Sequence, residues 1–365
     1  MDLSGIIKRA VKDGKKRAEP LWKGPEVDGI TYSLLSRFLV CRERFRLLVV
    51  EGLRPKDEFN HRLEYGQMWH VCEEALASNS PHKDHGWEFF LVEYCKGLCK
   101  KYPTSQEQID NWYGICKTQF PAYVSWWSKH PDVVARTPLL QEQVFSVPCQ
   151  LPSGRTVKLR GKLDSVDLIG KGNGAGIYLQ ENKTKSRVDE RQLKRQLTFD
   201  LQTMLYLVAL ERFLPGFCSM DHGLAGDKPP PILGVRYNVV KRPAQYRGKK
   251  ETAEGFRSRL SAIIADSPQD FFMRFKVEVT TDDIAKFRRQ CLDPILEQLC
   301  DWWEWIGNEP DPFQPDVNGN ICHWRHPFGV WNVLDEGGSS ELDEHLATGS
   351  TVGLERAERL FEELS

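Results

Sequence analysis

The hydrophobic pattern divides the chain into a helical first part and a strand-rich middle. Apolar residues recur at three- and four-residue spacing from Thr31 to Val49, which predicts a helix there. The same spacing predicts further helices over residues 62–77, 86–101 and 105–129. Three later segments are short, rich in Val, Leu and Ile, and separated by turn formers: residues 139–149, 155–169 and 175–184. They predict three consecutive strands that form a meander.

Helices and strands then alternate up to residue 307. Helices are predicted over 197–213, 252–265 and 281–307, and strands over 232–241 and 271–279. Pro294 should kink or split the last helix. The chain beyond Glu309 is rich in loop formers, with a short acidic helix predicted over 352–363. This order predicts an α/β core with a helical cap.

We expect four parts along the chain. They are a flexible basic arm (1–28), a helical region (29–135), a core (136–310) and a loop-rich acidic C-terminal tail (311–365).

Composition narrows the class of protein. The chain has 365 residues, of which 40% are hydrophobic, enough for a sizeable core. Its formal net charge of -1 gives no indication of nucleic-acid binding, so such binding would require basic residues concentrated on one face. No apolar run approaches the length of a membrane span, and the charged N-terminus lacks the apolar stretch of a secretion signal. Ten cysteines without such a signal favour reduced thiols and a cytoplasmic location.

Two short motifs carry the chemistry. Asp164 ends the string Gly-Lys-Leu-Asp, and Glu181 and Lys183 belong to Glu-Asn-Lys on the next predicted strand. Because side chains alternate along a strand, Glu181 and Lys183 share one face, whereas Asn182 points away and offers only its backbone carbonyl. Two carboxylates on adjacent strands suit Mg²⁺ or Mn²⁺, and a neighbouring lysine can orient or help deprotonate the attacking water. The pattern therefore indicates metal-assisted phosphodiester hydrolysis.

Other interpretations of these residues stay open at this point. The motif is short, and a solvated ion pair with a turn aspartate would produce it as well. The apolar positions change phase beside Asp164, which predicts a bulge or bend in that strand. Glu142, on the preceding strand, is either a carboxylate that supports the site or a surface charge.

Taken together, four landmarks resemble the RecB-like branch of the PD-(D/E)XK nuclease superfamily, as found in phage and mobile-element exonucleases. The first is the Asp164 and Glu181–Lys183 pair, and the second is the helical signature Gln202-x-x-x-Tyr206. The third is His70, at the end of Gly-Gln-Met-Trp-His on an upstream helix. The fourth is an opening helix with Tyr-Ser-Leu-Leu-x-x-Phe-x-x-Cys-x-x-x-Phe over residues 32–45. They occur in the expected order over residues 31–240.

The resemblance implies a restriction-endonuclease-like α/β fold, a mixed sheet flanked by helices with an N-terminal helical region. It also implies a metal site of His70, Asp164, Glu181 and the Asn182 carbonyl, with Asp164, Glu181 and Lys183 catalytic. Gln202 and Tyr206 would position DNA, although they would equally serve as a helix-surface and a core residue. The implied function is a Mg²⁺- or Mn²⁺-dependent DNA exonuclease or end-processing enzyme of recombination or repair. Its candidate protein partners are a recombinase, a helicase or a single-strand-binding protein.

Three rivals remain. They are an endonuclease with structure or sequence specificity, a catalytically silent DNA-binding subunit, and an RNA-directed nuclease. Some relatives carry an iron–sulfur cluster on four cysteines, but here only Cys41 and Cys322 stand in suitable places and no cysteine follows Cys322. We therefore expect no cluster.

Two basic segments are candidate DNA contacts. The first follows the Glu-Asn-Lys strand and contains Lys185, Arg187, Arg191 and Arg195. The second, over residues 241–250, is equally well explained as a solvated charged loop.

Overall fold

The structure, a computed structural model, describes ten stretches of the chain. They are residues 20–40, 42–55, 59–76, 85–128, 136–170, 175–198, 200–218, 230–245, 247–305 and 354–356. The described residues form two compact units whose segments interleave along the chain. Unit 1 combines Met1–Asp57, Ser146–Arg160 and Arg289–Ser365, and unit 2 combines Glu58–Phe145 and Gly161–Arg288.

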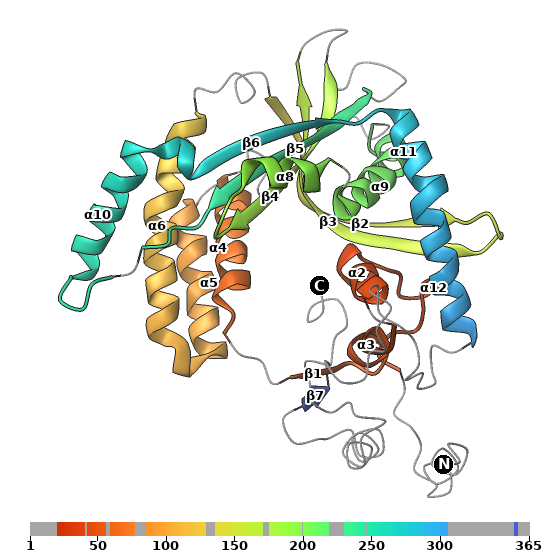
Figure 1. Ribbon diagram of the computed structural model, residues 1–365, viewed down its shortest axis with the longest axis horizontal. Coiled ribbons are helices and arrows are strands. Elements are labelled where there is room, and N and C mark those ends of the chain that lie inside the picture. The colour runs from red at the N-terminus through yellow and green to blue at the C-terminus, as the bar shows by residue number, and fades with distance from the viewer. Residues whose placement is uncertain are drawn as a thin grey trace, which may run out of the picture. The chain divides into compact units, whose positions relative to one another are not determined.

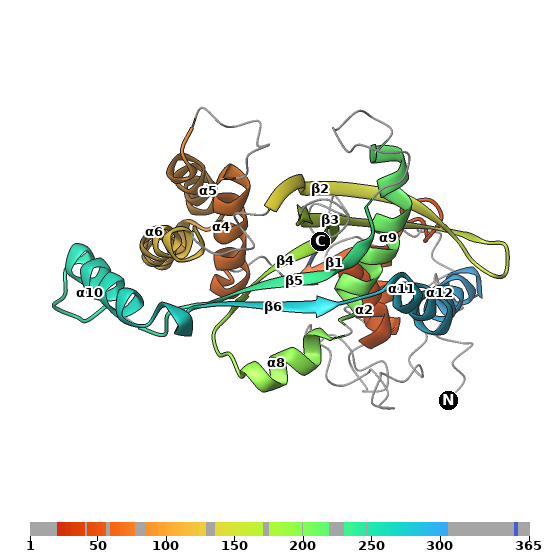
Figure 2. The same ribbon diagram turned by 90° about the horizontal axis from the view of Figure 1, so that it is seen from above.

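The centre of the fold is a five-stranded mixed sheet in the order β2-β3-β4-β5-β6 (Figures 1 and 2). β3 and β4 pair antiparallel, β4 and β5 pair parallel, and β5 and β6 pair antiparallel. The predicted mixed sheet and its meander of three strands are therefore confirmed. The strands are β2 (Arg136–Gln150), β3 (Thr156–Ile169), β4 (Gly176–Lys185), β5 (Ile232–Lys241) and β6 (Phe272–Glu278).

Helices of unit 2 lie on both faces of the sheet. Gln202 of α9 hydrogen-bonds Glu181 and Lys183, so α9 covers the face that these two residues share. Tyr123 of α6 hydrogen-bonds Asn238, whose side chain lies on the opposite face. The helices of unit 2 are α4 (His61–Leu76), α5 (Trp87–Lys101), α6 (Gln106–Trp127), α8 (Glu190–Leu197), α9 (Leu201–Cys218), α10 (Ala253–Asp266) and α11 (Thr281–Phe287).

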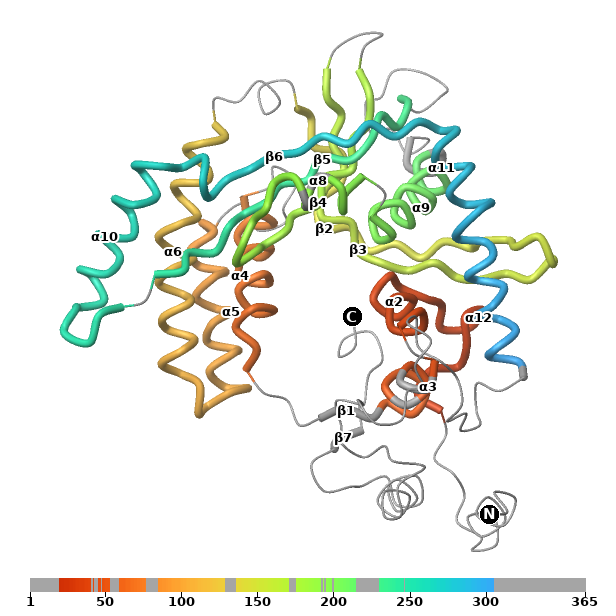
Figure 3. Tube along the Cα trace, in the orientation of Figure 1, coloured from red at the N-terminus to blue at the C-terminus, as the bar shows by residue number. Residues whose placement is uncertain are grey.

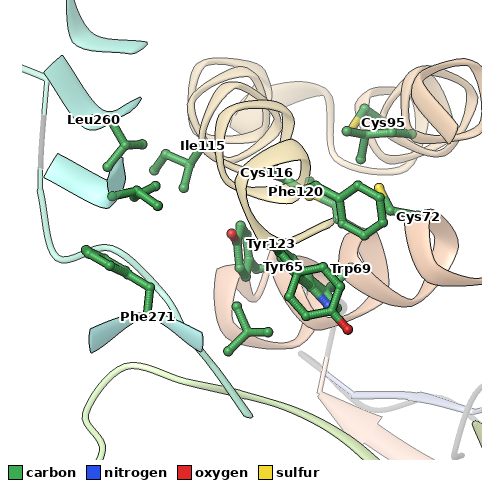
Figure 4. Packing of buried hydrophobic residues seen from close by; sticks show 14 of the residues in the cluster. Tyr65, Trp69, Cys72, Cys95, Ile115, Cys116, Phe120, Tyr123, Leu260 and Phe271 are labelled. Atoms are coloured by element: carbon green, nitrogen blue, oxygen red, sulfur yellow. The ribbon is translucent and has the colours of Figure 1, made fainter. Parts of the chain in front are cut away.

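The helices α4, α5 and α6 pack side by side around an aromatic core (Figures 3 and 4). Trp69 is fully buried, and its ring lies edge-on to Phe120 and Tyr123 at centroid distances of 5.1 Å. Such aromatic pairs add about 0.5–1.5 kcal/mol to the burial of their surface. Because Trp69 precedes His70 in the chain, this packing fixes where the His70 side chain leaves α4.

Unit 1 holds the opening helix and the end of the last one. Trp22 is fully buried and packs edge-on against Phe45 and Trp303, at 5.2 and 4.9 Å between ring centroids. Trp22 lies within the segment expected as a flexible arm, so that expectation is wrong for this residue; residues 1–19 lie outside the described residues. The elements of unit 1 outside the five-stranded sheet are α2 (Tyr32–Val40), α3 (Arg42–Phe45), a π-helix (Arg46–Val50), β1 (Leu53–Pro55), α12 (Asp293–Trp305) and β7 (Leu354–Arg356).

Most predicted elements are present within a few residues, and three differ. The helix expected over 197–213 is α9, and a further helix, α8, precedes it and was not predicted. The helix over 281–307 is divided by a π-helical turn, Arg288–Leu292, before Pro294, as expected for a proline that removes a backbone donor. The helix predicted over 352–363 is wrong where it is described, because Leu354–Arg356 pairs with β1 as an antiparallel strand. The rest of the tail, including Cys322, lies outside the described residues, as does Cys41.

Composition led to expectations about membrane-spanning segments and about cysteines, and the structure describes both features. None of the described helices is long and apolar enough to cross a membrane. Among the residues whose side chains the structure describes, seven cysteines carry free thiols, namely Cys72, Cys95, Cys99, Cys116, Cys149, Cys291 and Cys300.

Candidate active site

The two carboxylates expected on neighbouring strands come together. The β3–β4 register pairs Ser165 with Gln180, so Asp164 and Glu181 are the next residues on each strand. The backbone N–H of Asn182 donates to Asp164 Oδ2 at 2.7 Å. Both side chains lie in unit 2 and are mostly buried: that of Asp164 is 12% exposed and that of Glu181 4%. The spatial convergence that the motifs predict is therefore present.

The irregular backbone lies on β2 rather than on β3. Glu142 has a φ of 46°, in the left-handed region that non-glycine residues seldom adopt. Such a conformation costs on the order of 1–3 kcal/mol and persists where the surrounding structure imposes it. The phase change beside Asp164 has a simpler cause than a bulge, because Ser165, Val166 and Asp167 are all buried and both faces of β3 are covered there.

The strained Glu142 joins the site. Its Oε1 lies 3.3 Å from His70 Nδ1, and its Oε2 is paired with Lys162 Nζ at 2.6 Å. His70 Nδ1 also lies 3.8 Å from Asp164 Oδ1. The sequence offered a weak signal for Glu142, the one carboxylate of the strand Arg136–Gln150. It is a buried member of the cluster and not a surface charge.

Lys183 is held by two neighbours. Its Nζ donates to Glu181 Oε1 at 2.7 Å and to Gln202 Oε1 at 2.6 Å, and Gln202 Nε2 donates to the same Glu181 oxygen at 2.7 Å. Gln202 therefore fixes the relative position of the carboxylate and the ammonium. Its expected contact with DNA stays a prediction.

Tyr206 lies one helical turn after Gln202, and its ring is close to Gly161, the glycine of the Gly-Lys-Leu-Asp motif. Its ring is edge-on to Phe145 at 5.5 Å, and its hydroxyl lies 3.5 Å from Gln202 Nε2. A Cβ atom at Gly161 would lie 2.7 Å from the Phe145 ring and 2.9 Å from the Tyr206 ring. The glycine before Lys162 is thus required by the close approach of two rings to β3.

The Asn182 side chain points away from the carboxylates, as the strand alternation predicts. Its Oδ1 accepts from Asn238 Nδ2 at 3.1 Å and from Gln180 Nε2 at 3.4 Å, on the other face of the sheet. Only the Asn182 backbone remains beside Asp164.

Crowded acidic groups dominate the electrostatics. Burial and then the charge of Glu181 raise the pKa of Asp164 to about 8. Burial alone would lower the pKa of His70, but Asp164 and Glu142 outweigh it and raise that pKa to about 9. Burial also acts to raise the pKa of Glu142, yet its hydrogen bond with His70 and its contact with Lys162 bring that pKa below its usual range. Three carboxylates thus crowd together in a mostly buried site.

The donor set fits a divalent metal ion. Among the described residues, one group of metal-ligating side chains clusters closely: one ligand atom each of His70, Glu142 and Asp164, all within 4.8 Å of one another. Glu181 is not in that group, but its Oε2 is buried and has no hydrogen-bond partner in the described part of the chain. A buried carboxylate oxygen without a donor is unfavourable unless a cation satisfies it. Three carboxylates and one imidazole form an oxygen-rich site that suits Mg²⁺ or Mn²⁺.

The first basic segment continues directly from β4. Lys185 ends the strand, Arg187 follows it, and Arg191 and Arg195 lie on α8; all four are exposed. A row of exposed cationic side chains therefore follows Lys183 along the chain, and such a row can contact a phosphate backbone.

Comparison with known proteins bears on this geometry. A family model described as the PD-(D/E)XK nuclease superfamily matches residues 30–323, well over half of the chain. The match includes every residue of the cluster. No curated protein matches the sequence. With its mixed sheet and the matched span, the chain belongs to the PD-(D/E)XK nuclease superfamily.

Proposed function

We propose that this protein is a divalent-metal-dependent DNA nuclease that acts as an exonuclease or a DNA-end-processing enzyme. One observation carries the proposal: Asp164, Glu181 and Lys183 meet beside His70, with a buried Glu181 oxygen that lacks a donor. A structural ion pair would satisfy both carboxylate oxygens, whereas Glu181 Oε2 has no hydrogen-bond partner among the described residues.

The metal ligands would be His70, Asp164, Glu181 and the backbone carbonyl of Asn182. To these we add Glu142, which shares the ligand cluster. When bound, Mg²⁺ or Mn²⁺ supplies Lewis-acid stabilisation of the charge that develops on the phosphate.

Lys183 would act as a hydrogen-bond donor. Burial lowers its pKa, but the charge of Glu181 outweighs burial, and the net pKa lies above the usual lysine value. The ammonium therefore keeps its proton near neutral pH, orients the attacking water and stabilises a phosphate oxygen. Gln202 holds Lys183 in place, and Gln202 and Tyr206 together form the surface that we expect to position DNA.

The decisive experiment is digestion of end-labelled linear DNA with Mg²⁺. Asp164→Ala and Lys183→Ala should each lower the cleavage rate at least about 1,000-fold while the protein stays folded, because both residues contact the reacting groups. The matched controls are Asp282→Ala and Lys286→Ala, at exposed positions of α11, and they should cleave as wild type does. Equal cleavage by all five proteins would exclude this site.

Three further assays separate the rival functions. An exonuclease leaves closed circular DNA intact, whereas an endonuclease with structure or sequence specificity cuts it. Binding without cleavage in Mg²⁺ and in Mn²⁺ would identify a silent DNA-binding subunit. Competition between DNA and RNA substrates tests an RNA-directed nuclease. A role in recombination or repair, with a recombinase, helicase or single-strand-binding protein as partner, and a cytoplasmic location are part of the same proposal.

A further inference from the structure

A second, uncompensated cationic position lies at the end of β5. Arg242 follows β5 directly and is only 6% exposed, and its backbone N–H donates to Lys185 O at 2.7 Å. Its Nε and Nη1 are buried and have no hydrogen-bond partner among the residues that the structure describes. A buried guanidinium with unused donors is unfavourable in the free protein, and a bound anion would offset that cost.

The surroundings of Arg242 are positive. Burial and then the charge of Arg62 lower the pKa of Arg242. Burial also lowers the pKa of His61, with Arg242 and Arg62 adding to the effect. The His61 ring is stacked on Trp112, with centroids 5.2 Å apart and planes 10° from parallel. No carboxylate of the described residues contributes to the pKa shift of Arg242 or of His61. The positive charge of this cluster is therefore not balanced by these groups, and an anion could balance it.

Two neighbouring cations of the same segment have contacts of their own. Lys241 Nζ lies 6.0 Å from the centre of the Phe271 ring, and Arg247 pairs with Glu107 at 3.7 Å. At the start of α4, Asn60 Oδ1 accepts from the N–H of Arg62 at 3.0 Å, so a helix N–H is used there as well. An anion would therefore be held by the side chains of Arg242, Arg62 and His61.

We propose that Arg242, together with Arg62 and His61, binds a phosphate group of the DNA strand on which the nuclease acts. This inference rests on the proposed function and adds to it a second contact with the same strand. Guanidinium groups match the geometry of phosphate oxygens and stay charged when buried.

The cluster lies at a similar distance from the proposed metal ligand His70 and from Lys183. Arg62 and His70 are eight residues apart on α4, which is about 12 Å at 1.5 Å per residue. The β4–β5 register pairs Lys183 with Val239, and Arg242 lies three residues further on, which is about 10 Å along a strand. The cluster would then bind a phosphate near the scissile one on the same strand.

The first test measures phosphate binding without metal or cleavage. In EDTA, inorganic phosphate should raise the melting temperature of the wild type above that in sodium chloride of equal ionic strength. Arg242→Met keeps the aliphatic stem and removes the charge, and we expect its phosphate affinity to fall about tenfold or more. Arg247→Met, five residues further along, is the matched control and should respond to phosphate as wild type does. Equal stabilisation of Arg242→Met and wild type, or none of either, would overturn the proposal.

A second variant covers a failure to fold. Arg242→Met should melt no lower than wild type, because it removes an unpaired buried charge. Should it nevertheless not fold, Arg62→Gln changes an exposed residue of the same cluster and should weaken phosphate binding severalfold. Unchanged binding by that variant counts against the cluster.

The second test identifies the source of the phosphate. Oligonucleotides with and without a 5′-phosphate are bound in EDTA over a range of salt concentrations. If the site takes a backbone phosphate, Arg242→Met should weaken binding of both and reduce the slope of log affinity against log salt by about 1. A loss confined to the 5′-phosphorylated strand assigns the site to a strand end. Loss of inorganic phosphate binding alone, with both oligonucleotides unaffected, overturns the assignment to DNA.

Failure of this inference and failure of the proposed function are distinguishable. Phosphate binding is measured without hydrolysis, and cleavage is measured through Asp164 and Lys183. If the wild type cleaves DNA but is not stabilised by phosphate, only the proposed phosphate site is wrong. If phosphate stabilises the wild type but the protein does not cleave DNA, only the proposed nuclease function is wrong.

Discussion

The two faces of the central sheet differ in how their buried carboxylates are paired with positive groups. On the face of Asn182, Asp167 lies between Arg236 Nη2 at 2.6 Å and Arg136 Nε at 2.7 Å, with Asp167 and Arg236 fully buried. On the side of Glu181, the carboxylates of Glu142, Asp164 and Glu181 lie together, and the positive groups beside them are His70, Lys162 and Lys183. The carboxylates of both faces are mostly buried, at 0% exposure for Asp167 and 12% for Asp164. The balance of charge is what distinguishes a structural network from a site that needs a cation.

Removing one carboxylate from each face should give the largest contrast. Asp167→Asn leaves two arginines without a counter-charge and should lower the free energy of unfolding by about 3–5 kcal/mol. Asp164→Asn removes like-charge repulsion, so in EDTA at pH 8 it should raise that free energy by about 1 kcal/mol or more. Urea denaturation of both variants checks the two signs. The comparison fails if both variants lose stability equally.

Metal binding should depend steeply on pH on the Glu181 face. Asp164 and His70, with pKa values raised to about 8 and about 9, hold protons at pH 6 that a metal ion must displace. Affinity for Mn²⁺ should therefore rise with pH by about tenfold per unit for each proton displaced, which for two protons approaches about 10,000-fold from pH 6 to pH 8.

Titration calorimetry in two buffers of different ionisation enthalpy counts the released protons. An affinity that is flat over this range, with no proton release, would show that these two groups are not ligands. In EDTA, the stability that Asp164 contributes falls as pH rises, whereas metal affinity increases. A carboxyl with a raised pKa contributes stability below its unfolded value, near 3.9, and loses that contribution as pH rises toward 8.

The smallest expected effect concerns the packing that supports the site. Gly161→Ala forces the Phe145 and Tyr206 rings to move and should lower stability by about 1–3 kcal/mol. We expect cleavage to fall about tenfold with it, because Tyr206 is adjacent to Gln202. Gly97→Ala is the control: nothing lies within 4 Å of a Cβ there, and α5 should gain about 0.5–1 kcal/mol. Melting temperatures and cleavage rates of the two variants separate crowding at the site from a general effect of the methyl group.

Local pattern alone was enough to predict most elements. Apolar periodicity located α4, α5, α6, β4 and β5 within a few residues, because each buries one face or both. It missed α8, whose residues are mainly charged or amide side chains, so the Leu193 and Leu197 positions gave too short an apolar row. It also missed the pairing of β1 with β7, two three-residue strands about 300 residues apart, because so remote a pairing leaves no local periodicity.

The sequence by itself determined which chemical groups the site contains. Strand alternation placed Glu181 and Lys183 on one face and turned the Asn182 side chain away, since that depends only on the period of two along a strand. Tertiary structure decided the rest. Glu142 becomes a candidate ligand through a left-handed backbone at a position that no motif marks, and Gln202 is occupied by Glu181 and Lys183. These depend on distances between segments far apart in the chain, and such distances are set by how the helices and strands pack, which no short stretch of sequence encodes.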